Sequence, residues 1–194
     1  MNVMPLLLLI YSCFAINLVL QCALGLKGIT ESKAQFNRSA FAKLLLIFTA
    51  VIFTWFLFSR ILFSLVHGIY IYVLLFPVSM IVYDSAEYFV FRYIVKKDAG
   101  SESIFTFPGG ITAAASFICL NVANTFFEVF IMSFGFVSGI FLVNLVIREI
   151  RSRAALESVP FFLRGKPLVL VSMGILSLIL LTASVLVFRM IDAG

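Results

Sequence analysis

The sequence is poor in charge. Only 12% of its 194 residues are Asp, Glu, Lys or Arg, whereas 63% are hydrophobic. A soluble domain of this length would need a much larger polar surface to stay in water. This composition excludes a soluble enzyme or a soluble binding module. It predicts an all-α integral membrane protein that forms a single membrane domain over residues 1–194.

Residues that bind metals or form disulfides are also scarce, with three cysteines and one histidine. Cys13, Cys22 and Cys119 each lie inside an apolar run, and their spacing fits neither a zinc motif nor a ferredoxin motif. No disulfide framework follows. The sequence also shows no nucleotide-binding loop and no hydrolytic triad. Its net charge of +5 reflects membrane orientation rather than nucleic-acid binding.

What the sequence has instead is a series of long apolar runs, each close to the roughly 20 residues that a helix needs to cross a bilayer. Charged residues delimit six of them. The predicted spans are residues 1–26, 32–59, 68–94, 108–127, 129–147 and 167–188. Pro77 falls inside the third span and is expected to kink it. The most polar stretch, residues 148–166, separates the last two spans.

Basic residues are distributed unevenly among the links between these spans. Twelve of the fourteen Lys and Arg residues fall in or beside the links after the first, third and fifth spans, and only Arg60 and Arg189 fall on the opposite side. Cytoplasmic loops of membrane proteins carry an excess of Lys and Arg. We therefore expect both termini on the non-cytoplasmic side.

Six spans divide into two halves of three, residues 1–97 and 98–194. An odd number of spans in each half forces the halves into opposite orientations, which is the arrangement of an inverted repeat. We expect broken first and fourth helices, because such folds interrupt these helices near the midplane. The small and polar residues at these places are Asn17, Gly25, Lys27, Gly109, Gly110, Asn121 and Asn124. The alternative is that they only let helices approach closely.

The last third of the chain carries a more specific pattern. Its residues are Arg148-Glu149, Val159-Pro160, Arg164-Gly165 and the run VSMGILSL at 171–178. In order and spacing they resemble the end of the RnfA and NqrE type membrane subunits, which belong to the Rnf electron transport complex and the sodium-pumping NADH:quinone reductase. Similar residues occur upstream, at Leu24-Gly25-Leu26, Glu87, Pro108, Ile111-Thr112, Phe134-Gly135-Phe136 and Ser138-Gly139.

The resemblance implies a multi-pass protein of the bacterial inner membrane with two inverted three-helix repeats. It also implies partners: a homologous six-helix subunit, other subunits of an Rnf/Nqr-like complex, and the lipid bilayer. In that family two such subunits together hold an iron–sulfur cluster within the membrane. The cluster passes electrons between flavin and iron–sulfur subunits on opposite sides.

The family's cluster cysteines correspond here to Lys27 and Ala115, and neither residue is an iron ligand. Cys22 and Cys119 lie in the same predicted helices, but they are displaced by roughly 6 to 7.5 Å along the helix axis. We therefore expect that this chain binds no cofactor. The alternative is a [2Fe-2S] cluster shared with the partner subunit, with Cys22 and Cys119 as substitute ligands. Lys27 is interpreted either as a plug of the empty pocket or as a side chain that reaches the cytoplasmic face.

Two acidic residues lie near the cytoplasmic end of the third span. Asp84 and Glu87 are three residues apart and share a helix face. They could pair with Arg92 or with basic residues of neighbouring links. They could instead form a cation path, because ionisable residues within membrane spans are costly and commonly functional.

Three hypotheses for function follow. The first is a membrane subunit of an Rnf/Nqr-like complex that acts as scaffold and ion path without a complete iron–sulfur site. The second is an accessory or stand-alone transporter of ions or small solutes with the same inverted-repeat fold. The third is a structural assembly partner.

Overall fold

The structure is a computed structural model that describes residues 4–20, 38–62, 70–90, 92, 108–156 and 165–192. Within these ranges the chain is helical with short turns, and it contains no strand. Four of the described helices are long and apolar enough to cross a membrane. The all-α fold and the presence of membrane-length helices are therefore confirmed.

The first helical segment ends well inside its uncharged run. Helix α1 (Met4–Ile10) continues as a π-helical turn, η1 (Tyr11–Ala15), and the backbone leaves helical geometry at Ile16. The segment is shorter than about 20 Å, so it does not by itself cross a hydrocarbon core of about 30 Å. Residues 21–37, where the first span was predicted to continue and the second to begin, lie outside the described residues.

The second and third predicted spans are found as long helices. Helix α3 (Arg38–Leu57) continues as the π-helical turn η2 (Phe58–Leu62) and so passes Arg60, where the sequence predicts its end. Helix α5 (Tyr70–Val90) contains Pro77, as predicted. Each includes a candidate membrane span of 21 residues.

Helix α6 (Pro108–Val122) is the second short segment. It has 15 residues, or about 22 Å of length. Gly109 and Gly110 lie in its first turn, so the predicted break of the fourth helix is not found between Pro108 and Val122. Residues 93–107 before it lie outside the described residues. Six uninterrupted crossings are therefore not seen, because the first and fourth segments are each too short.

Helix α7 (Phe126–Leu156) corrects the predicted boundary of the fifth span. It has 31 residues, about 46 Å, and continues well beyond Ile147. The residues from Arg148 to Arg153 are therefore helical rather than part of a link. Glu149 forms an ion pair with Arg153 at 2.8 Å, one turn apart, and such pairs allow a helix to continue into a polar region.

Helix α8 (Lys166–Asp192) forms the sixth predicted span. Like α5, it exposes large hydrophobic side chains, among them Leu178 and Leu186 on α8 and Val73 and Ile81 on α5. A soluble protein rarely shows such extended apolar faces. They suit contact with acyl chains, where helices satisfy their own backbone hydrogen bonds.

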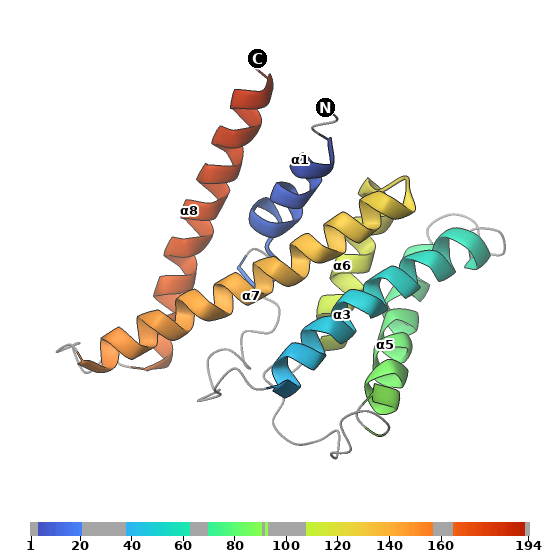
Figure 1. Cartoon of the computed structure of the whole chain (residues 1–194), viewed down its shortest axis with the longest axis horizontal. Helices are drawn as coiled ribbons and strands as arrows, with labels where there is room; N and C mark the ends of the chain where they lie inside the picture. The colour runs from blue at the N-terminus through green and yellow to red at the C-terminus, as the bar shows by residue number, and fades with distance from the viewer. Residues whose placement is uncertain are drawn as a thin grey trace.

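The packing of the helices does not follow their order in the sequence. Helices α3 and α7 contact each other at the centre of the molecule (Figure 1), where Phe48 packs edge-on against Phe130 with ring centroids 5.2 Å apart. The segment α1–η1 contacts α7 and α8, whereas α6 contacts α3 and α5. Figure 1 also shows both chain termini at the same end of the molecule.

Two glycines of α7 let η1 approach closely. A Cβ atom at Gly135 would lie 1.8 Å from Ser12 Oγ, and one at Gly139 would lie 2.6 Å from the carbonyl oxygen of Cys13. Between them, Ser138 donates a hydrogen bond to Cys13 Sγ at 3.5 Å. Any side chain at Gly139 would push the backbone of η1 away, so this glycine sets the position of the first segment on α7.

We expect Gly139→Ala to destabilise the fold by about 1–3 kcal/mol, because its methyl group overlaps with backbone rather than with a movable side chain. The matched control is Gly174→Ala in α8, where an added Cβ meets nothing within 4 Å. Thermal unfolding of both variants in detergent would test this. Equal melting temperatures for the two variants would contradict the close packing of η1 on α7.

Candidate functional site

A buried ion pair joins α3 to α5. Lys43 Nζ lies 3.5 Å from Glu87 Oε1. The Lys43 side chain is 3% exposed and that of Glu87 is 17% exposed. Both residues belong to the predicted membrane spans Phe41–Ile61 and Tyr70–Val90. Charges so placed are expensive to bury, and each one is tolerated because the other compensates it.

A tyrosine hydroxyl lies next to this pair. Tyr83 is fully buried, and its hydroxyl forms no hydrogen bond of normal geometry within the described part of the chain. The charged group that acts on it most strongly is Glu87, one helical turn further along α5. Lys43, Glu87 and Tyr83 therefore form one polar cluster between two helices.

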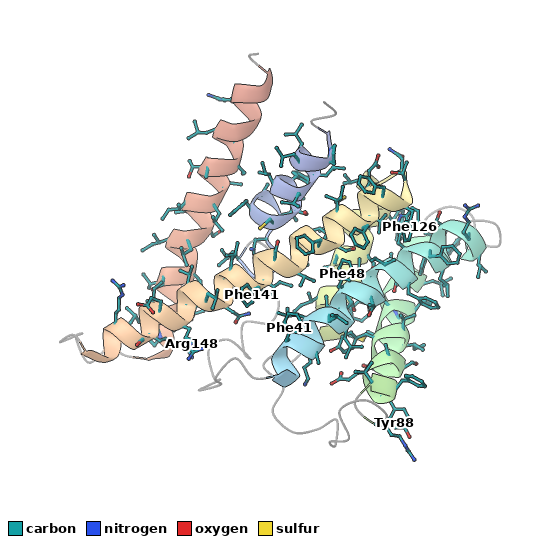
Figure 2. The ribbon with its side chains drawn as sticks, viewed as in Figure 1. Phe41, Phe48, Tyr88, Phe126, Phe141 and Arg148 are labelled. Carbon is teal, nitrogen blue, oxygen red and sulfur yellow. The ribbon has the colours of Figure 1, made fainter. Side chains whose placement is uncertain are left out.

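Asp84 and Arg92, the other residues that the sequence places near Glu87, lie elsewhere. Asp84 is exposed, so it does not join the buried cluster despite its spacing. Arg92 donates to the hydroxyl of Tyr88 and its guanidinium lies over the Tyr88 ring, 5.4 Å from the centroid. Figure 2 shows Tyr88 at the end of α5 away from both termini, pointing out of the bundle. Glu87 thus pairs with a basic residue near the first link, Lys43, rather than with Arg92.

An open groove of about 550 Å³ runs beside the cluster, between α3 and α5. It begins one turn from Lys43, at Leu46, and includes Ala86, the neighbour of Glu87. No charged residue lines it, and its only polar side chains are Thr49 and Ser85. The groove suits an apolar occupant, since its lining carries no charged group.

A second polar cluster closes the end of the first helical segment. Asn17 Nδ2 donates to the carbonyl oxygen of Cys13 at 3.1 Å, and its Oδ1 accepts from the N–H groups of Val19 and Leu20 at 3.2 and 3.3 Å. One buried side chain thus satisfies backbone groups on both sides of the helix end. This is what a helix end requires where water cannot serve as partner. Asn17 therefore supports the backbone.

The positions implied for an iron–sulfur cluster do not fit one. Ala115 is fully buried in α6 and offers only a methyl group. Cys119, one turn further on, is also fully buried, and its thiol faces Ser133 of α7. It therefore points into the core of this chain rather than toward a surface where a partner subunit could share a cluster. Lys27 and Cys22 lie outside the described residues.

The two thiols in the described part of the chain are kept apart. Cys13 contacts Ser138 and Cys119 faces Ser133. Five residues separate these serines on α7, which is about 140° around the helix and about 7.5 Å along it. The thiols therefore lie on different sides of α7. In the described ranges no group of three or more His, Cys, Asp or Glu residues could hold a metal ion.

The sequence did not identify Lys43 or Tyr83 as site residues. Lys43 was counted among the basic residues near the first link, and the structure instead places it on the inner face of α3. Tyr83 carried a usable signal, because it precedes Glu87 by four residues and so shares its helix face. Glu149, which the sequence analysis noted only as part of the family-like pattern, pairs with Arg153. Figure 2 shows Arg148 near the exposed end of α7.

No model of a known protein family matches the chain, and no curated protein matches it. The resemblance to the RnfA and NqrE type subunits therefore stays a prediction.

We expect Lys43→Met and Glu87→Gln each to lower the free energy of unfolding by about 3–5 kcal/mol, because each leaves an uncompensated buried charge. The double variant removes both charges and should be much closer to the wild type. Thermal unfolding of the four proteins in detergent forms a double-mutant cycle. Strictly additive effects would show that the two side chains do not interact.

Proposed function

We propose that the chain is a membrane subunit of an ion-translocating electron-transport complex of the Rnf/Nqr type. In this proposal it acts as scaffold and cation path, and it holds no iron–sulfur cluster of its own. It lies in the bacterial inner membrane beside a homologous six-helix subunit, with both termini on the non-cytoplasmic side.

The observation that carries this proposal is the exchange of short helices between the two halves. The first helix of one half, α1–η1, contacts α7 and α8 of the other half, and α6 contacts α3 and α5. The pairing of α3 with α5 likewise corresponds to that of α7 with α8. Two inverted repeats related by a twofold axis would produce this pattern. The short segments are the first helix of each half, where such folds place their functional site.

The buried ion pair supports a cation path. Glu87 is the acidic residue that the sequence resemblance marks, and among the described residues it is the acid that lies partly buried next to a cation. It lies between α3 and α5, the helices against which α6 packs. A carboxylate within a membrane span that remains partly accessible is the usual device for moving cations.

The lack of fitting ligands among the described residues of α6 supports a chain without its own cluster. Iron–sulfur clusters need thiolates or, less often, imidazoles. Ala115 offers neither, and the Cys119 thiol points into the core beside Ser133. Stoichiometric iron in the anaerobically purified chain would overturn this part of the proposal.

A stand-alone transporter is the second candidate. Ala115 favours it, because an alanine side chain cannot bind iron. A chain that keeps the exchanged helices while Ala115 replaces a ligand could move ions without redox chemistry. The two candidates differ in their partners. Genes for flavin-bearing and ferredoxin-like subunits beside this one, together with copurification of their products, support the complex, and isolation supports the transporter.

We expect Glu87→Gln to reduce cation uptake by membrane vesicles nearly to the level of vesicles without the protein, because the neutral amide cannot attract a cation. Asp84→Asn is the matched control, since Asp84 is exposed on the same helix. Sodium and proton uptake should be followed with an electron donor present and absent. Unchanged uptake in Glu87→Gln vesicles would instead favour the structural assembly partner.

A further inference from the structure

The ion pair between Lys43 and Glu87 has an open geometry. Its atoms are 3.5 Å apart, whereas a charge-assisted hydrogen bond between an ammonium and a carboxylate is typically about 2.8 Å long. The ammonium therefore neutralises Glu87 without being locked to it by a short hydrogen bond. Withdrawal of the ammonium would leave a carboxylate oxygen facing the space that Lys43 now fills.

Tyr83 supplies a second oxygen beside the carboxylate. Its hydroxyl is buried and forms no hydrogen bond of normal geometry in the described ranges, although a buried hydroxyl normally has a partner. Glu87 and Tyr83 lie one turn apart on α5, so both present oxygen atoms on one face. Oxygen ligands from carboxylates and hydroxyls are the kind that hard cations prefer.

Glu87 is the more accessible member of the ion pair. The Glu87 side chain is 17% exposed, whereas that of Lys43 is 3% exposed. A small cation with part of its water shell could therefore approach the carboxylate near the end of α5 without crossing the apolar core. Because Lys43 already supplies one positive charge, a second cation would be repelled until the ammonium moved away.

We propose that the Lys43 ammonium is the resident counter-cation of an oxygen site formed by Glu87 and Tyr83, and that this site accepts a monovalent alkali cation once the ammonium is withdrawn. This deepens the proposed function, since it assigns Lys43 as the gate of the same cation path. Cation binding at this site does not require electron transport, so the binding site and the proposed function can be tested separately.

The test compares sodium chloride with choline chloride at equal ionic strength, using the full chain in detergent above the titration range of carboxylates. In Lys43→Met, sodium should replace the lost charge and raise the melting temperature by at least about 3 °C over choline. Lithium and potassium, tested alone, report the size preference. The wild type should show no sodium-specific shift, because the ammonium occupies the site.

Two further variants identify the ligands. Lys43→Met combined with Glu87→Gln should lose the sodium-specific shift completely, and Lys43→Met combined with Tyr83→Phe should require more sodium for the same shift. Lys43→Gln serves as a second variant without the ammonium. It should show the same sodium dependence as Lys43→Met.

Three results would overturn the proposal. They are an equal melting temperature of Lys43→Met in sodium and choline, a sodium-specific shift of the same size in the wild type, and failure of both Lys43 variants to fold even in high sodium. Absence of cation uptake by vesicles that contain the wild-type protein, without any of these results, would leave the binding site in place. It would count against the transport role alone.

Discussion

The close contact of the first helical segment with α7 is the constraint on which the arrangement of the two halves depends. At Gly139 the backbone of η1 comes so near that only a hydrogen atom fits between them. This contact holds a segment too short to cross a membrane against a helix long enough to cross one. The end of the short segment then lies inside the protein, where Asn17 replaces the water that would otherwise satisfy the backbone.

Polar groups away from water need partners within the protein, and this also explains where the ion pair lies. An isolated Glu87 or Lys43 would be too costly on a helix surrounded by hydrocarbon, so each charge needs the other from a neighbouring helix. The pair consequently couples the positions of α3 and α5. Any event that separates the two charges must therefore be compensated by a proton, a cation or a movement of α3.

Hydropathy was sufficient to predict the all-α class, the membrane-length helices and the order of the helices in the described ranges, because apolar length is a local property of the chain. The predicted end of the fifth span was wrong. Residues Arg148 to Arg153 were interpreted as a link, but they continue helix α7, where Glu149 and Arg153 form an ion pair. The site was found only in part. Glu87 was identified from its position in an apolar span, but its partner depends on which face of α3 turns inward, and a single charged residue near a link does not reveal this.

Apolar packing also fixes the position of the short helix α6. In α6, Ile111, Ala115 and Cys119 are fully buried and belong to the main hydrophobic core, which also contains Leu46 and Ile47 of α3. The position of α6 is thus maintained by apolar packing rather than by a metal centre. Ala115 is itself part of this packing. Both short segments, α1–η1 and α6, are therefore held by long helices from the other half of the sequence, and apolar contacts alone fix where α6 lies.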